Sequence, residues 1–384
     1  MAWAEAVVAA IDSSLGGVLA AALLLPGVLA PAAHAETAPE QGVVSLKLSN
    51  YRDWQPGLDR VKVNAPSIYV LAPLDAHWSL EGSLVNDAVS GASPRYHSAV
   101  SGASKMDDSR TAGDVKLTHY ADRQAWSVGA ASSSEHDYRS NTLSGEWRMA
   151  SDDNNRTWNL GLAYSDDEIG STNDPTLDER RRTWQLMAGV TQAWTSVDLV
   201  QLNLGASFGK GYYSDPYKFP DARPDERRQT TALLRWNHHV ESIGATLRTS
   251  WRLYDDSWGV RAHTLDAAWV QPVAEGWTVT PMLRYTTQRA ARFYYDPVYD
   301  ATLGAPFPSG FSNLTHYSAD QRLSAFGAAT AGLRVDWQVD RQWKLDLSYE
   351  RYEQRGDWRL GGDGSPGLAP FSARWWQLGL SRSF

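Results

Sequence analysis

The stretch Trp343-Lys344-Leu345-Asp346-Leu347-Ser348-Tyr349-Glu350 alternates apolar and polar side chains without interruption. A repeat of two places successive side chains on opposite faces of a β-strand, so Trp, Leu, Leu and Tyr share one face while Lys, Asp, Ser and Glu share the other. The same alternation returns at 158–164, 200–206, 245–253 and 333–337. Repeated strands with one apolar and one polar face predict a sheet between an apolar and an aqueous environment.

The spacing of these segments predicts an all-β fold, a closed antiparallel transmembrane β-barrel of about sixteen strands, or fourteen if the first pair is not embedded. We expect the strands near 44–51, 62–72, 76–86, 112–121, 124–133, 139–149, 156–165, 182–194, 197–207, 228–239, 242–254, 259–271, 276–288, 323–338, 342–353 and 372–384. These boundaries make every second connection short, at 73–75, 122–123, 150–155, 195–196, 240–241, 272–275 and 339–341. The long connections, 87–111, 166–181, 208–227, 289–322 and 354–371, all fall between them. Outer-membrane barrels sort their connections in this way, with short turns at one edge and long loops at the other.

Composition agrees with a membrane barrel and excludes several other classes. The chain of 384 residues has 18 tryptophans, no cysteine and a formal charge of −8. Its mean hydropathy of −0.43 is too polar for a bundle of membrane helices, whereas a barrel needs apolar residues only at alternate positions. The absence of cysteine excludes disulfides and thiolate metal sites, and the acidic balance argues against a nucleic-acid partner.

The two ends of the chain predict export and assembly. An apolar run from Leu15 to Ala30, followed by Ala33-His34-Ala35, is typical of a cleaved secretory signal over residues 1–35, although no Lys or Arg precedes the run. The alternative is a single membrane anchor, for which the run is short. We expect residues 36–384 to form one outer-membrane domain. Its last segment alternates and stops on Phe384, the form of final strand that the barrel-assembly machinery recognises, which would make that machinery a partner.

The polar faces of the expected strands carry many charged side chains. Those assigned to the barrel lumen are Glu146, Arg148, Arg235, Arg248, Arg252, Asp266, Arg284, Arg334, Asp336, Lys344, Asp346 and Glu350. They can simply pair across neighbouring strands, or they can form a charged path that tunes what passes through the pore. Their mixed signs argue against strong ion selectivity.

Signals for metals and catalysis are weak. The adjacent residues His238 and His239 would point to opposite faces of a strand, so they cannot bind one ion together. The acidic segment 166–168 lies in an expected loop and could hold Ca²⁺, but it lacks the spacing of a calcium-binding loop. The basic segment 180–182 could pair with these acids or contact lipopolysaccharide phosphates. No nucleophile or phosphate-binding motif is present, so we expect no metal, no cofactor and no enzymatic activity.

Two of the expected long loops are rich in aromatic and charged residues. The candidates for an external site are Tyr212, Tyr213, Asp215 and Tyr217 in the loop 208–227, with Arg292, Tyr294, Tyr295 and Asp320 in the loop 289–322. Such residues can form a rigid packed cap or a binding surface. Because so much aromatic area favours burial, we expect at least one of these loops to fold inward and narrow the pore.

The same loops carry a resemblance to a known family. The segments Tyr213-Ser214-Asp215-Pro216-Tyr217-Lys218, Tyr254-Asp255-Asp256-Ser257-Trp258-Gly259-Val260-Arg261 and Ser318-Ala319-Asp320-Gln321-Arg322-Leu323 resemble the bacterial proteins grouped as domain of unknown function 3570. The resemblance spans nearly the whole chain after the signal and implies no established activity. Genes of this family lie beside those of a small lipoprotein, a thioredoxin-like protein and a flavin-attaching transferase, which implies a periplasmic lipoprotein or redox partner.

The sequence therefore supports three candidate functions. The first is a pore or transport barrel whose opening is restricted by loops, set among outer-membrane lipid and lipopolysaccharide. The second is a scaffold that holds an envelope redox or lipoprotein partner. The third, the weakest, is an outer-membrane enzyme.

Overall fold

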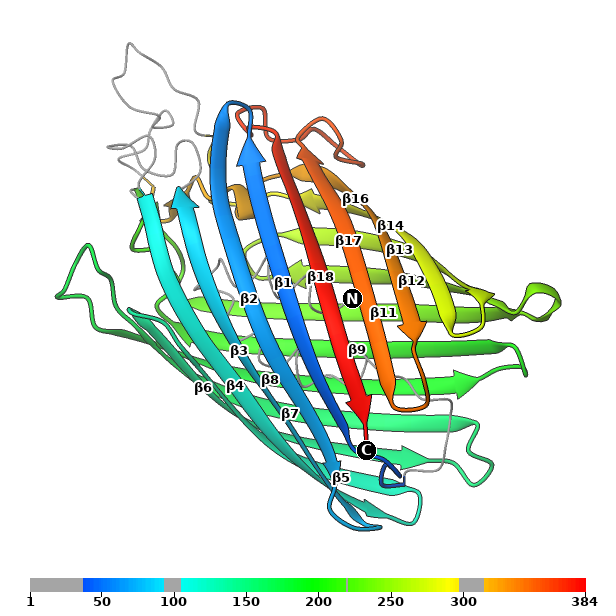
Figure 1. Ribbon diagram of the computed structural model, residues 1–384. Helices are drawn as coiled ribbons and strands as arrows, with labels where there is room; N and C mark the ends of the chain where they lie inside the picture. Colours follow the sequence, from blue (N-terminus) through cyan, green and yellow to red (C-terminus); the bar gives the residue numbers. More distant parts are fainter. Residues whose placement is uncertain (1–36, 93–104, 219, 297–313) are drawn as a thin grey trace.

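The computed structural model describes residues 37–92, 105–218, 220–296 and 314–384 of the chain. Sixteen antiparallel strands form a closed barrel in which nearly all neighbours in sequence are neighbours in the sheet, as Figure 1 shows. The expected signal segment 1–35 lies outside the described residues, as do parts of the connections 87–111 and 289–322. In the described ranges, no helix is long and apolar enough to cross a membrane.

The barrel strands follow the chain in order around the wall. They are β1 (Val43–Gln55), β2 (Leu58–Pro73), β3 (Trp78–Ala92), β4 (Lys105–Ala121), β5 (Gln124–Ser134), β6 (Tyr138–Ala150), β7 (Arg156–Ile169), β8 (Glu179–Ala193), β9 (Asp198–Gly211), β11 (Glu226–Val240), β12 (Ala245–Asp256), β13 (Arg261–Ala274), β14 (Trp277–Arg289), β16 (Phe326–Gln338), β17 (Trp343–Arg355) and β18 (Phe371–Ser383). Two further pieces, β10 (Asp221–Ala222) and β15 (Tyr317–Ser318), pair with each other outside the barrel wall.

The barrel closes where its first and last strands meet. β1 pairs with β18 without a register shift from Val43↔Ser383 to Trp54↔Ser372. The backbone of Phe384 also exchanges hydrogen bonds with Gly42, at 2.9 and 3.0 Å. Closure leaves the sheet without an exposed edge, which a barrel in lipid requires because lipid cannot satisfy free backbone groups.

The prediction of sixteen strands is confirmed, but several expected boundaries are wrong at the edge with the long loops. The expected connection 52–61 is a tight turn between Gln55 and Leu58, and the expected loop 166–181 is mostly strand, since β7 runs to Ile169 and β8 starts at Glu179. At these strand ends both faces carry charged residues. A prediction based on alternating apolar residues therefore assigns them to a loop. These strands therefore extend beyond the apolar part of the wall.

The two faces of the wall follow the alternation in the sequence. On β17, Leu347 is 51% exposed on the outer face while its neighbour Asp346 is only 4% exposed on the inner face. Leucines at 202 and 204 on β9 are likewise exposed on the outside. The register therefore places Asn203 and Lys344 on the inner face and Leu345 on the outer face, as the sequence predicts.

Aromatic side chains border the apolar band at both edges. Beside the short turns, Trp277 of β14 stacks on Trp337 of β16 with ring centroids 5.0 Å apart. Toward the loop edge, Tyr164 of β7 packs on Trp184 of β8 at 4.7 Å. Such girdles mark the two interfaces of a membrane.

Candidate functional site: a loop cluster over a charged lumen

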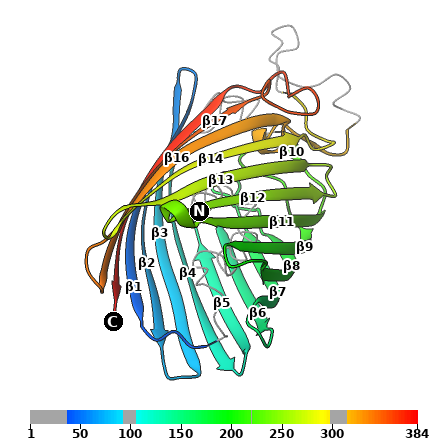
Figure 2. The same cartoon turned by 90° about the vertical axis from the view of Figure 1, so that its right-hand side faces the viewer.

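The loops β9–β11 and β14–β16 are tied together by a small sheet of their own. β10 pairs antiparallel with β15 through Asp221↔Ser318 and Ala222↔Tyr317. Figure 2, which labels β10, shows it at the loop edge of the wall. Because the two loops are more than sixty residues apart in sequence, this pairing fixes two otherwise independent segments to one another.

A buried carboxylate joins the same two loops. Asp320 is about 1% exposed at its side chain, and its Oδ2 atom accepts hydrogen bonds from Lys218 Nζ at 2.6 Å and Arg223 Nη2 at 2.8 Å. Its Oδ1 atom accepts from the Arg322 Nε atom at 2.9 Å and the Arg322 backbone N–H at 3.0 Å. Burial by itself raises the pKa of Asp320, but Arg322, Lys218 and Arg223 outweigh it and hold that pKa well below the ordinary value.

Two further carboxylates balance these cations. Asp221 pairs with Arg223 Nε at 2.9 Å, and Asp215 lies 2.9 Å from Lys218 Nζ and 3.3 Å from Arg322 Nη2. Burial raises the pKa of Asp221, although Arg223 and Lys218 oppose that rise. We call these six residues the loop charge cluster: Asp215, Lys218, Asp221, Arg223, Asp320 and Arg322. Three anions and three cations pair with one another here, so the cluster joins the two loops rather than forming a free binding site.

An aromatic core lies beside the loop charge cluster. Trp258, in the β12–β13 turn, packs edge-on against Tyr213 and Phe293, with ring centroids 5.2 Å apart in both pairs. The guanidinium groups of Arg227 and Arg181 lie 4.1 and 5.0 Å from the ring centroids of Trp258 and Tyr213. The sequence left open whether these loops form a packed cap or a binding surface, and this packing favours the cap.

The other external-loop candidates also contact neighbouring loops. Tyr217 places its hydroxyl 2.9 Å from the Thr172 backbone N–H, which links the loop to the β7–β8 connection. Arg292 is exposed and donates to the Ser257 carbonyl oxygen, while Tyr295 is buried and its backbone N–H donates to Ser318. Tyr212 and Tyr294 are half-buried, and burial raises the pKa of both phenols. Most of these residues thus serve loop packing.

The β17–β18 loop also contacts these loops. It joins them through the Gly367 N–H, 3.3 Å from Asp296 Oδ1, and through Ser365, whose backbone N–H donates to the Ala325 carbonyl at 2.9 Å. Arg60 of β2 is buried at the same edge of the barrel. Arg60 itself pairs with the inward Asp53 at 3.3 Å.

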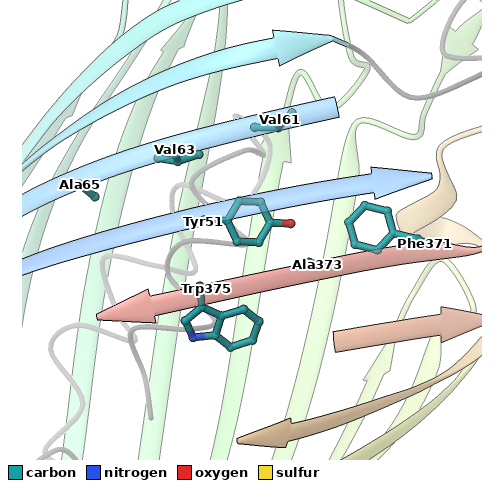
Figure 3. Close-up of a cluster of buried hydrophobic side chains, with 7 residues drawn as sticks. All are labelled: Tyr51, Val61, Val63, Ala65, Phe371, Ala373 and Trp375. Carbon is teal, nitrogen blue, oxygen red and sulfur yellow. The ribbon is translucent and has the colours of Figure 1, made fainter. Parts of the chain in front are cut away.

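The wall below Arg60 carries an inward apolar patch. Figure 3 draws its members on β1, β2 and β18, which are Tyr51, Val61, Val63, Ala65, Phe371, Ala373 and Trp375. The Arg60 guanidinium lies 4.9 Å from the centre of the Phe371 ring, and the Tyr51 hydroxyl donates to Asp53 at 2.9 Å. This side of the mouth is therefore lined by packed aromatic rings instead of free charges.

The register places the sequence-predicted lumen residues on the face opposite the apolar band. They are Glu146 and Arg148 on β6, Arg235 on β11, Arg248 and Arg252 on β12, Asp266 on β13, Arg284 on β14, Arg334 and Asp336 on β16, and Lys344, Asp346 and Glu350 on β17. Many pair across strands, as Asp266 Oδ1 does with Arg284 Nε at 2.5 Å and Asp336 Oδ1 with Lys344 Nζ at 2.9 Å. Lys47 on β1 shares this inner face, but the strand pattern did not single it out.

Three arginines on β11 and β12 lie together on the lumen wall. Arg235 lies opposite Ser250, which Arg248 and Arg252 flank on β12. Arg235 donates to the neutral Gln201 side chain at 2.9 Å, and the neighbouring carboxylate, Asp266, is bound to Arg284. We call Arg235, Arg248 and Arg252 the arginine arc.

The remaining sequence-based candidates have structural partners. The basic segment 180–182 pairs with the acids of β7, most closely through Arg181 Nη2, which lies 2.7 Å from Asp167 Oδ2 in a buried contact. His238 contacts Asp198 and His239 contacts Thr246, so the two rings have separate partners. Within the described residues, no group of three or more His, Asp or Glu side chains could hold a metal ion.

The fold is that of an outer-membrane β-barrel. CdiB from Acinetobacter baumannii has a similar fold, with a TM-score of 0.50 and 9% identity, over 88% of this chain and 60% of CdiB. Two other solved structures align over nearly their full length. They are OccK9 (OpdG) from Pseudomonas aeruginosa, with TM-score 0.46, 12% identity and coverage of 90% and 98%, and OmpT from Vibrio cholerae lacking loop L8, with 0.45, 9% and coverage of 89% and 99%.

The family follows from the sequence. The family model described as "Protein of unknown function (DUF3570)" matches residues 101–177 and 171–375, so the chain belongs to this family and the predicted resemblance is confirmed. No match was found among curated proteins. This chain spans less than two thirds of CdiB, and the identities are too low to transfer more than the fold.

Proposed function

We propose that the chain is a pore or transport barrel of the bacterial outer membrane whose opening is restricted by its own loops. The observation that carries this proposal is the fastening of four loops into one layer through the loop charge cluster, the β10–β15 sheet and the contacts of Tyr217 and Ser365. A closed wall of sixteen strands encloses a space wide enough for an aqueous channel unless loops fill it. Loops that are fastened over such a mouth reduce its width and can gate it.

The lumen suggests which solutes pass most easily. Many inner charges pair across strands, and the three guanidinium groups of the arginine arc lie together on the wall of β11 and β12. A narrow pore with a basic wall favours small hydrophilic anions over cations, but only modestly because carboxylates line the rest of the wall. The substrate class that fits best is therefore a small anionic solute.

Single-channel recording tests this proposal. The refolded barrel should conduct in a planar bilayer at well below the level of an open sixteen-stranded porin, with a reversal potential in a salt gradient that indicates mild anion preference. An open-porin conductance would contradict the restricted mouth, and a cation preference would contradict the assignment of solute class.

The scaffold function makes a different prediction for the same experiment. A barrel that only holds a periplasmic lipoprotein or redox partner should show no conductance and should co-purify with that partner from native envelopes. We propose no catalytic role, and turnover of lipid or polysaccharide by the pure barrel would overturn that expectation.

A further inference from the structure

A row of four basic side chains crosses the outer face of the wall where the chain closes on itself. The register pairs Lys62 of β2 with Arg52 of β1, Arg52 with Arg374 of β18, and Arg374 with Arg351 of β17. Side chains that are directly opposite on neighbouring strands lie about 5 Å apart. Four cations thus stand side by side on four adjacent strands, and we call them the basic row.

The carboxylates of this face do not neutralise the basic row. Glu353, one step above it, accepts from Arg351 Nε at 2.9 Å, but it also binds Arg355 at 2.8 Å and the Ser372 hydroxyl at 2.7 Å. In the part of the chain that the structure describes, no carboxylate pairs with Lys62, Arg52 or Arg374. Like charges directly opposite one another destabilise a sheet, so an external anion is the natural complement of this row.

The level of the basic row matches that of membrane phosphates. The next outward residues toward the short-turn edge are Asn64, Asn50, Trp376 and Tyr349, and the row after that is Pro66, Leu48, Leu378 and Leu347. Trp376 and Tyr349 are more than 40% exposed, as aromatic residues at a membrane interface are. The basic row therefore stands directly above the aromatic girdle, on the edge that carries the long loops.

An apolar groove lies on the same face below the girdle. It has a volume of about 670 Å³ and is lined chiefly by outward side chains that include Leu46, Leu48, Ile68, Leu378 and Leu380. The groove begins four residues along the strand from the basic row, a distance of about 13 Å at the usual strand rise. A phosphorylated head above and an apolar groove below, in line on the same strands, fit one amphipathic molecule.

We propose that this face binds a lipopolysaccharide molecule of the outer leaflet, with its phosphates on the basic row and an acyl chain in the groove. This inference rests on the proposed outer-membrane location but not on the pore function. Arginine suits the role because its planar guanidinium binds phosphate oxygens in pairs, and Arg351 is held in place 4.3 Å from the centre of the Trp54 ring. A bound lipid here would cover the seam where β1 and β18 close the barrel.

The test compares two triple variants of the full barrel. The test variant is Arg52→Gln, Lys62→Gln and Arg374→Gln. The control variant is Arg180→Gln, Lys210→Gln and Arg261→Gln, which removes the same charge from the outer face near the same edge, where each cation already has a carboxylate 2.6 to 3.3 Å away. Folding of all proteins is checked by heat-modifiable mobility on gels.

Binding is measured by native mass spectrometry with four separate probes, which are lipopolysaccharide, dephosphorylated lipopolysaccharide, phosphatidylglycerol and inorganic phosphate. We expect the test variant to lose about tenfold or more in lipopolysaccharide affinity and the control variant to stay within about twofold. The wild-type barrel should bind the other three probes weakly. A variant with lysine at 52 and 374 should keep more lipopolysaccharide affinity than the test variant but less than the wild type, because lysine keeps the charge and loses the paired guanidinium contacts.

Several results would overturn the inference. They are wild-type affinity in the test variant, an equal loss in the control, and equal binding of the dephosphorylated lipid or of free phosphate. If the basic row binds an acidic protein partner instead, the test variant should keep wild-type affinity for lipopolysaccharide. Conductance is recorded separately from lipid binding. A negative result for lipopolysaccharide binding therefore does not contradict the pore proposal, and a negative result for conductance does not contradict the lipopolysaccharide proposal.

Discussion

Replacement of Asp320 by asparagine should release the loops that we propose restrict the barrel mouth. The carboxylate is about 1% exposed and binds three cations, Lys218, Arg223 and Arg322. Without this carboxylate, water can solvate the three cations only if the cluster opens. Removal of one partner from a buried ion pair typically costs about 3–5 kcal/mol, because the remaining charges stay buried without their counter-ion. Even 3 kcal/mol corresponds to roughly a hundredfold rise in the population of released loops.

Two measurements follow this release. Hydrogen exchange at the backbone of 220–225 and 317–323 should speed up by about two orders of magnitude, while exchange in the barrel strands stays unchanged. Single-channel conductance should rise toward that of an open barrel. The matched control is Asp255→Asn, because Asp255 pairs with Arg261 on the exposed surface and such pairs contribute at most about 1 kcal/mol. Unchanged exchange and conductance in the Asp320 variant would refute the view that the cluster fastens the loops.

Three further predictions address the lumen and the loops. Glutamine at all three positions of the arginine arc should shift the reversal potential toward cations without a large change in conductance, and an unchanged potential would mean that another region selects the ion. Cysteine at 346 should react with a water-soluble maleimide faster than cysteine at 345 in a lipid-embedded barrel, whereas the opposite order would show that the register is wrong. Because the pKa of Asp320 is depressed, its ionised form stabilises the loops at every pH above the ordinary carboxyl value and this stabilisation is lost only as the pH falls through the depressed value. The rise in conductance that protonation of Asp320 causes should therefore occur only below about pH 4, whereas protonation of Asp221, whose pKa is raised, causes a separate change at higher pH. Absence of the step below about pH 4 in a variant with Asp221→Asn would contradict the role of Asp320.

Much of the barrel could be predicted from the sequence because strand faces are a local property. Alternation in 343–350 assigns Asp346 and Leu347 to opposite faces without knowledge of any neighbour, and the order of short and long connections then implies a closed antiparallel wall. Local alternation fails where both faces meet water. For this reason the strand residues Asp167 and Arg181 were expected in a loop, although they form a buried ion pair across β7 and β8.

The functional features depend on partners that lie far apart in the chain. The sequence by itself determined the closed antiparallel wall of sixteen or fourteen strands, the face of side chains in the alternating segments and the concentration of aromatic and charged residues in two loops, since each of these follows from composition or a short repeat. Only the tertiary structure decided that Asp320 joins Lys218 and Arg223, and that Arg52 stands beside Arg374. The reason is that cross-strand register and loop docking are set by closure of the whole sheet. The local sequence around a charged residue does not identify the distant residue that closure places beside it.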